Sequence, residues 1–304
     1  MRLQICPRRF FSFVLAVAAL AYIASAGDSA YRQSIEQWRR DYEARLTSDT
    51  GWLTISGLFW LHEGENQFGS DPLNDIVLPA SAVPPAAGFF DYRAGRTTVH
   101  INPGVAATLA GKPVQSAELR PDSKEERLVI GDLSLWVHAS GERYAIRVRD
   151  KNSPLRRSFT GANWFPIDES YVVSAKYMPY DPPKKLDSEN VLGDPIKVDV
   201  VGSVLFTLRG QQFRLDAESN GPGKGLFIVF RDLTSGKETY PAARFLDSDE
   251  PKDGPSGKTV ELDFNKAYNP PCAYNPYTTC PLPLPGNRLR VEIRAGEKIY
   301  KHAH

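Results

Sequence analysis

Residues 128–150 of this 304-residue chain, LVIGDLSLWVHASGERYAIRVRD, contain the hydrophobic pattern from which the fold class is predicted. Apolar residues occupy every second position over 133–137 and again over 144–148. This alternation predicts strands with one buried face, because successive side chains of a strand point to opposite sides. The dipeptide Gly131-Asp132 separates two apolar runs by two residues, which is typical of a tight antiparallel hairpin.

The same signals recur outside this stretch. A second two-residue turn, Arg209-Gly210, joins two apolar runs, and short strand-like runs continue as far as 288–294. No alternation of strands with helices is visible, which argues against a parallel dinucleotide-binding sheet. The expected helix covers 29–48, where apolar residues recur at helical spacing. We therefore predict a mostly β protein with antiparallel sandwich or barrel-like sheets and one N-terminal amphipathic helix.

The chain is expected to divide where its composition changes. A polar stretch over 151–166 ends one strand-rich block and precedes another, and 179–195 resembles a surface loop rich in proline and charge. The two β-rich lobes could share one core, because all-β domains can reach this size. The predicted divisions are a signal peptide over 1–26, a helix over 27–50, a β-sandwich lobe over 51–150 and a C-terminal β-rich lobe over 151–304.

The first 26 residues predict export from the cytoplasm. Three arginines precede a 14-residue apolar run over 10–23, and Ala24-Ser25-Ala26 matches a cleavage site. The alternative is an uncleaved N-terminal anchor. Cleavage would leave 34 basic and 36 acidic side chains. That balance excludes the strongly basic surface typical of nucleic-acid binding, and no later apolar run is long enough to span a membrane. We expect a periplasmic or secreted protein.

Two cysteines, Cys272 and Cys280, remain after cleavage. An even pair in an exported chain predicts a disulfide, which would close a short loop. Free thiols and a metal site are the alternatives. No histidine lies near the pair, so we predict no metal.

Three segments together carry a family resemblance: Gly51–Pro79, Asp232–Leu246 and Leu262–Lys298. Their longest motif is LDFNKAYNPPCAY, over 262–274. With these motifs the chain resembles the bacterial exported family known as domain of unknown function sixteen-eighty-four, over essentially its whole mature length. The resemblance implies no known activity and supplies no catalytic residue.

The N-terminal lobe also resembles forkhead-associated domains. Residues 67–79, QFGSDPLNDIVLP, are similar to the strand–loop–strand that opens those β-sandwiches, and 128–133 is similar to a later strand. The phosphate-contacting arginine of that family is replaced by Ser70, and its Ser-x-x-His pair is missing because Pro84 follows Ser81 at that spacing. The resemblance therefore implies a sandwich scaffold and does not extend to phosphothreonine binding.

Polar and aromatic residues are densest over 232–280, in irregular segments that proline and the predicted disulfide would hold rigid. Carboxylates and amides hydrogen-bond hydroxyl groups, and tyrosine rings stack on apolar ligand faces. We predict a site for a small polar ligand such as a glycan. Its proposed residues are Asp232, Glu238, Tyr240, Arg244, Asp263, Asn265, Tyr268 and Asn269. The competing interpretation is that the same residues cap turns and fill gaps between strands.

Two other classes of function remain open. A hydrolase would use two carboxylates among Asp232, Glu238 and Asp263 across a cleft. Against it, Arg244 is expected to neutralise one of them in a structural ion pair. The third possibility is a structural or protein-interaction module without a small-molecule site. No motif indicates a cofactor, and nothing indicates the oligomeric state.

One basic surface also stands out. Arg143, Arg147 and Arg149 share one face of a predicted strand and could bind an anion. The interpretation we favour is a solvated face whose arginines pair with Asp or Glu on a neighbouring strand.

Overall fold

The computed structural model describes residues 29–255 and 257–300, so the predicted signal peptide lies outside the described residues. The protein is mostly β, with antiparallel sheets and one N-terminal helix, which confirms the fold class expected from the sequence. The described chain separates into two units, one that ends at Tyr42 and one that begins at Glu43. The helix covers 29–47, and within it the rings of Trp38 and Tyr42 stack with centroids 5.6 Å apart.

Two sheets form the N-terminal lobe. In spatial order the first contains β1 (Ile55–Trp60), β11 (Arg143–Asp150), β10 (Leu133–Ser140), β9 (Leu128–Ile130), β6 (Thr108–Leu109) and β7 (Lys112–Pro113). The second contains β3 (Ile76–Val77), β2 (Gly64–Gly69), β4 (Gly88–Arg93), β5 (Arg96–Ile101) and β8 (Ser116–Leu119). Their facing side chains form one core, with Phe68 and Phe90 from the second sheet and Leu135 and Ile146 from the first. The lobe is therefore a sandwich.

Both predicted hairpins are present. Gly131-Asp132 connects β9 to β10, with Ile130 opposite Leu133, and Gly131 has φ of +56°. Arg209 and Gly210 both have positive φ at the turn between β13 (Pro195–Leu208) and β14 (Gln211–Ser219), the combination that matches the twist of a two-residue hairpin. Positive φ favours glycine, because it has no Cβ to clash with the backbone.

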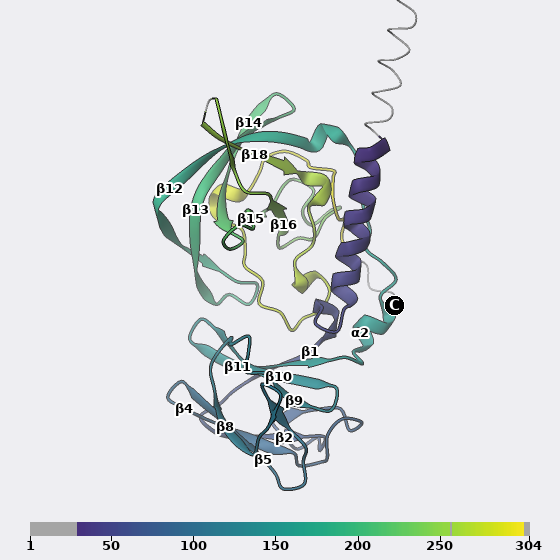
Figure 1. Cartoon of the computed structure of the whole chain (residues 1–304), viewed down its shortest axis with the longest axis vertical. Coiled ribbons are helices and arrows are strands. Elements are labelled where there is room, and N and C mark those ends of the chain that lie inside the picture. Colours follow the sequence, from purple (N-terminus) through teal and green to yellow (C-terminus); the bar gives the residue numbers. More distant parts are fainter. Residues whose placement is uncertain (1–28, 256, 301–304) are drawn as a thin grey trace, which may run out of the picture. The chain divides into compact units, whose positions relative to one another are not determined.

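A single sheet forms most of the C-terminal lobe. In spatial order it contains β16 (Arg244–Ser248), β15 (Leu226–Phe230), β14 (Gln211–Ser219), β13 (Pro195–Leu208), β12 (Val172–Glu189), β18 (Gly257–Asp263) and β17 (Lys252–Gly254). Strands β16 and β18 contact each other although four strands separate them in the sheet, so the sheet curves strongly (Figure 1).

The last part of the chain lies inside this curve. Figure 1 shows the segment after β18 running within the curved sheet, and Phe264, Leu289 and Ile293 from it join the core. The strand predicted over 288–294 is wrong: this segment makes isolated contacts rather than a ladder. Its apolar residues are buried by the concave face of the sheet, which gives the same hydrophobic pattern as a strand would.

The loop predicted over 179–195 is also wrong in most of its length. β12 continues to Glu189 and pairs with β13 from Pro195, with an irregularity between Pro179 and Lys184. Prolines and charges suggested a loop, but one face of the long hairpin is exposed to solvent. Leu186 and Val198 cover the other face in a small apolar cluster of their own.

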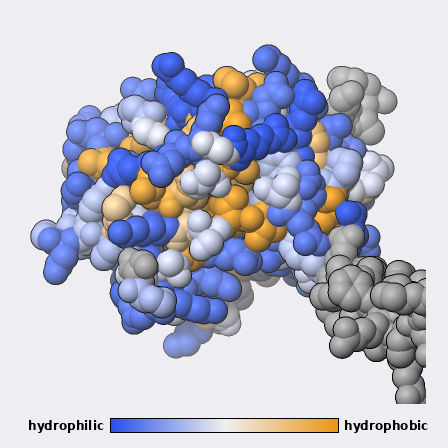
Figure 2. Space-filling view, turned by 90° about the horizontal axis from the view of Figure 1, so that it is seen from above, coloured by the Kyte–Doolittle hydropathy of each residue, from blue (hydrophilic) through white to orange (hydrophobic). Residues whose placement is uncertain are grey.

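Short helical segments connect these strands. They are α2 (Pro154–Ser158) and the 3-10 turns η1 (Trp52–Thr54), η2 (Glu169–Tyr171), η3 (Phe264–Lys266), η4 (Pro271–Ala273) and η5 (Pro285–Asn287). The two main cores draw on residues 68–148 and 171–295 respectively, so each lobe has a core of its own. Among the described residues no helix combines the length and the apolar character needed to cross a bilayer. Figure 2 shows one face of the molecule, where hydrophobic residues lie among more numerous hydrophilic ones.

Candidate functional site

Asp232 and Arg244 form a wholly buried ion pair in the C-terminal lobe. Arg244 begins β16 and lies opposite Phe230, and Asp232 follows β15 by two residues. Arg244 Nη1 donates to Asp232 Oδ2 at 2.7 Å and to the carbonyl oxygen of Ile293 at 2.9 Å. Its Nη2 donates to the carbonyl oxygen of Ala295. Burial lowers the pKa of Arg244, and the carboxylate of Asp232 opposes that shift.

The second oxygen of Asp232 is also bonded inside the protein. Oδ1 accepts from the backbone N–H of Thr234 at 2.6 Å and from the hydroxyl of Thr234. The carboxylate therefore closes the turn that follows β15, as aspartates commonly do. The ion pair that the sequence suggested is present, and it ties β15 and β16 to the segment at 293–295.

Asp263 and Asn265 hold another connection. Asp263 ends β18, and its Oδ1 accepts from the N–H of Asn265 at 3.0 Å, which caps η3. The fully buried amide of Asn265 bonds both backbone groups of Asp168, as acceptor at 3.0 Å and as donor at 2.8 Å. These two residues therefore hold η2, which precedes β12, against η3, which follows β18.

Tyr268 and Asn269 fasten the chain after η3. The backbone of Tyr268 exchanges two hydrogen bonds of 2.9 Å with Phe245, and its hydroxyl donates to Asp247 Oδ2 at 2.9 Å. Burial, with Asp247 nearby, raises the pKa of this hydroxyl. The side-chain amide of Asn269 donates to the carbonyl oxygen of Lys298 at 2.8 Å.

Glu297 completes this network and was missed by the sequence reasoning. It is fully buried, and it accepts from the N–H of Asn269 at 2.8 Å and from the hydroxyl of Tyr274. A buried carboxylate is costly unless it is hydrogen-bonded, so these contacts keep the end of the chain in place. The only signal for it was its position in Ala295-Gly-Glu-Lys298, which belongs to the motifs that carry the family resemblance.

Cys272 and Cys280 lie beside Tyr240. The Tyr240 hydroxyl donates to the carbonyl oxygen of Cys272 at 3.0 Å, and burial raises its pKa. Both cysteines are free thiols in this structure, and the N–H of Cys272 donates to Cys280 Sγ at 3.3 Å. The disulfide is not formed here and stays a prediction.

A cavity of about 330 Å³ opens beside Glu238. Three chain segments meet around it, joined by backbone hydrogen bonds from Lys298 to Asn163 at 2.7 Å and from Ile299 to Glu238 at 2.9 Å. The lining residues are Asn163, Trp164, Lys237, Glu238, Lys298 and Ile299. The cavity is thus built on the same C-terminal segment that Glu297 and Asn269 hold in place.

The walls of this cavity combine an indole ring with charges of both signs. The Nε1 of Trp164 donates to Glu43 Oε1 at 3.1 Å, which orients the ring. Glu238 Oε1 lies 3.0 Å from Nε of Arg294 and is about one third exposed. The Lys298 ammonium lies 5.2 Å from the ring centroid of Phe165, and Lys237 is exposed at the rim. Such a set can hydrogen-bond hydroxyls, hold an acidic group and stack on a flat face.

Of the eight residues proposed from the sequence, Glu238 is the one that lines this cavity. The other seven make the buried or half-buried contacts described above, each with a partner inside the protein. Trp164, Lys237 and Lys298 were missed. Trp164 falls in 151–166, which the sequence suggested only as a boundary between lobes, and no spacing rule links it to Glu238.

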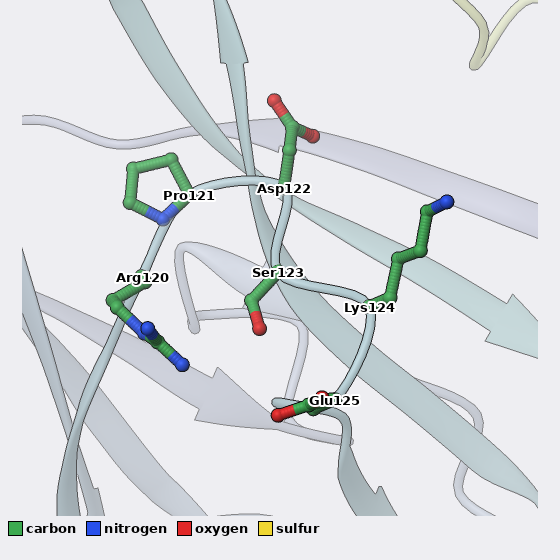
Figure 3. Close-up of a pocket in the computed structure, with 6 residues that line it drawn as sticks. All are labelled: Arg120, Pro121, Asp122, Ser123, Lys124 and Glu125. Carbon is green, nitrogen blue, oxygen red and sulfur yellow. The ribbon is translucent and has the colours of Figure 1, made fainter. Parts of the chain in front are cut away.

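Two further cavities lie in the N-terminal lobe. One, of about 210 Å³, adjoins the hairpin turn at Asp132 and includes Asp150 and Asn152. The other, of about 360 Å³, is lined by residues 120–125 alone, the turn between β8 and β9. Figure 3 shows Asp122 pointing away from Ser123 and Glu125 in that turn. Within the described residues, no three His, Cys, Asp or Glu side chains gather as metal ligands would.

Three solved structures are similar to parts of the chain. An uncharacterised protein from Haloarcula marismortui is 33% identical, and the match covers 47% of this chain and 78% of that one, with a TM-score of 0.40. Two forkhead-associated domains each match 30% of this chain with a TM-score of 0.23. One, studied for phosphothreonine-dependent interactions, is 18% identical over 92% of its length. The other, the FhaA domain in complex with an intracellular domain, is 19% identical over 97%.

No curated protein matches the chain at a significant level. Residues 157–298, which contain β12 to β18, the cavity wall at Lys237 and Glu238 and the buried Glu297, match the family model described as "Protein of unknown function (DUF1684)". Over these residues the chain is therefore similar to the DUF1684 family of proteins of unknown function.

Proposed function

We propose that this protein binds a small polar ligand, such as a glycan, in the cavity beside Glu238. The observation that carries the proposal is the lining of that cavity: one oriented indole ring, two lysines and one carboxylate around about 330 Å³. Ligand sites combine an apolar surface with a few placed polar groups, and this volume is at the small end of their usual range. One sugar ring or a molecule of similar size would fill it.

The charges favour a ligand that carries an acidic group. Lys237 and Lys298 both line the cavity, whereas its one carboxylate, on Glu238, already has Arg294 beside it. Hydroxyl groups of the ligand would bond Glu238 and Asn163. The face of a sugar ring would stack on Trp164, as apolar faces do on indole rings.

The hydrolase alternative has less support. It needs two carboxylates across an open cleft. Asp232 is wholly buried against Arg244, and Asp263 is buried as the cap of η3. Of the three candidate carboxylates, only Glu238 lines a described cavity. Binding without hydrolysis is therefore the function that the described side chains favour.

Isothermal titration of the purified protein with single sugars tests this proposal. N-acetylmuramic acid and glucuronic acid are the acidic probes, and N-acetylglucosamine is the neutral one. We expect an acidic probe to bind, and Glu238→Gln, Lys298→Met and Trp164→Leu each to weaken it about tenfold or more, as the loss of one good polar or stacking contact does. Bound ligand at 100 times its dissociation constant would add about 2.7 kcal/mol to the free energy of unfolding.

Glu292→Gln is the matched control, because Glu292 also contacts Arg294, at 3.4 Å, but lies outside the cavity lining. It should leave binding unchanged. No binding by any probe would contradict the proposal and favour the third alternative, a structural or protein-interaction module. Cleaved product in the same mixtures would instead favour the hydrolase.

We propose in addition that the protein is exported and that Cys272 and Cys280 then pair. The support is the charged and apolar pattern of residues 1–26, and the hydrogen bond of 3.3 Å between the two cysteines. Intact-mass measurement of the protein collected outside the cytoplasm tests both points. The chain should begin at or near Gly27 and should lack the two thiol hydrogens until it is reduced.

A further inference from the structure

Three arginines surround one tryptophan on the side of the first sheet that points away from the core of the N-terminal lobe. Ile146 and Val148 of β11 are in the core of that lobe, so the alternate residues Arg147 and Arg149 face the other way. Trp136 of β10 lies directly opposite Arg147 in the ladder. The guanidinium carbon of Arg127 lies 4.1 Å from the centroid of the Trp136 ring, and that of Arg149 lies 5.3 Å from it.

No carboxylate balances this charge at close range. Among the described residues, none of the three arginines has an ion pair: Arg147 donates to the hydroxyl of Thr279 at 3.2 Å, and Arg149 donates to Thr54 and Thr50. The interpretation favoured from the sequence, pairing with Asp or Glu on a neighbouring strand, is therefore wrong for Arg147 and Arg149. Ser134 and Trp136 are their partners on β10.

Arg143, on the same face of the same strand, behaves differently. Its Nη2 lies 2.6 Å from Asp194 Oδ1, and Asp194 is held in turn by Ser140. Asp122, whose charge acts on Arg147, already contacts His138 at 2.8 Å and the N–H of Ala139 at 3.2 Å. The cluster of Arg127, Arg147 and Arg149 thus keeps an excess of positive charge.

Two guanidinium nitrogens in the cluster lack an acceptor. Nε of Arg147 and Nη1 of Arg127 are buried and have no hydrogen-bond partner in the described part of the chain. Arg147 is only 7% exposed. Buried charges in proteins are normally paired or fully hydrogen-bonded, because an unpaired one is costly. Burial also lowers the pKa of Arg147 to about 10, although Asp122 acts in the opposite direction.

We infer that Arg127, Arg147 and Arg149 bind a phosphate group, beside the ring of Trp136. Guanidinium groups present parallel N–H donors that match the oxygens of a phosphate, and three of them suit a doubly charged tetrahedral anion better than a single carboxylate. Arg127 and Arg149 are half-buried, so the ligand would enter at their side and neutralise Arg147 behind them. This site is separate from the cavity at Glu238.

Titration calorimetry of the full protein at constant ionic strength tests the inference, with inorganic phosphate, glycerol 3-phosphate and acetate as probes. We expect saturable binding of phosphate, weakened about tenfold or more by Arg127→Gln and by Arg149→Gln, since each removes one charged donor. Arg143→Gln, on the same face but already paired with Asp194, should change the affinity less than about twofold.

The three probes distinguish a site for a phosphate ester from a site for free phosphate. Binding of both phosphate and glycerol 3-phosphate would assign the site to a phosphate ester, and binding of phosphate alone would assign it to the free anion. Equal binding of acetate, no binding of phosphate, or an equal loss in Arg143→Gln would overturn the inference. Because Arg127 and Arg149 are only half-buried, their variants test it even where Arg147→Gln does not fold.

Discussion

Arg244 and Arg147 are both buried arginines, but their surroundings differ. Arg244 has a carboxylate and two carbonyl oxygens as acceptors, all supplied by its own lobe. Arg147 has a single hydroxyl as acceptor, from Thr279 in the other lobe, and two more guanidinium groups nearby. In the first environment the charge is paired without a ligand, although Nε of Arg244 also lacks an acceptor within the described residues. The second has donors and charge that nothing within the described residues satisfies.

Architectural residues and candidate ligand-binding residues of this protein differ in whether their charges are already paired inside the protein. The residue types over 232–280 are typical of a ligand-binding site, but these residues mainly form hydrogen bonds with one another and with the backbone. The cavity at Glu238 is distinguished by unfilled space, and the cluster at Arg147 by positive charges that have no carboxylate partner among the described residues. Buried charges are normally paired, so an unpaired one is the better guide to a ligand.

The largest effect should come from breaking the complete pair. Asp232→Ala leaves Arg244 charged and buried without a carboxylate, and we expect the free energy of unfolding to fall by about 3–5 kcal/mol. Urea unfolding of the variant and the parent measures this. The double variant Asp232→Ala/Arg244→Met is the control, and should recover part of the loss because it removes the stranded charge. A loss below about 1 kcal/mol in the single variant would contradict the architectural role.

How far the sequence predicts the fold depends on the range of the interactions involved. The hairpins at Gly131 and Arg209 were predicted because turn chemistry and side-chain alternation are local. The hairpin extension over 179–195 was not, because Leu186 and Val198 are buried by residues such as Leu284, far along the chain. The segment over 288–294 has the hydrophobic pattern of a strand, but it packs inside a curved sheet.

The candidate site, too, could be predicted from the sequence only where its residues are close together along the chain. Glu238 was predicted because it lies in a dense polar stretch. Trp164 and Lys298 reach the same cavity from segments that are distant in sequence, and they meet there through the pairing of Trp164 with Glu297. The buried pair of Asp232 and Arg244 was anticipated as a pair. The second oxygen of Asp232 accepts hydrogen bonds from Thr234 only because the chain turns there. Residue types alone do not predict that turn.

The carboxyl group of Glu218 should have a smaller effect on the free energy of unfolding. Glu218 on β14 is half-buried, and no hydrogen bond or ion pair is described for its side chain. Burial, with Asp199 nearby, raises its pKa to about 7 from 4.5. The folded protein therefore binds a proton that the unfolded chain releases, so stability should fall as pH rises from about 4.5 to about 7 and then level off.

Glu218→Gln should abolish this part of the pH dependence. We expect it to stabilise the protein by about 1–2 kcal/mol at pH 8 and to change little at pH 4, where the parent carboxyl is protonated in both states. Urea unfolding across this range measures the effect, with Glu142→Gln in the exposed turn after β10 as the control. An unchanged pH profile would show that Glu218 is better solvated than its position suggests.

Replacement of Arg147 should have the smallest effect on stability, and it tests directly how Arg147 differs from Arg244. Arg147→Met replaces a buried charge that has no carboxylate partner and lies near two like charges, so its removal relieves repulsion and loses one hydrogen bond. We expect the free energy of unfolding to change by less than about 1 kcal/mol in either direction, when it is measured in phosphate-free buffer. Phosphate should stabilise the parent and leave this variant unaffected. If Arg147→Met lowers the free energy of unfolding as much as Asp232→Ala does, Arg147 has an architectural role too. Such a loss would require that its guanidinium already has a strong acceptor inside the protein.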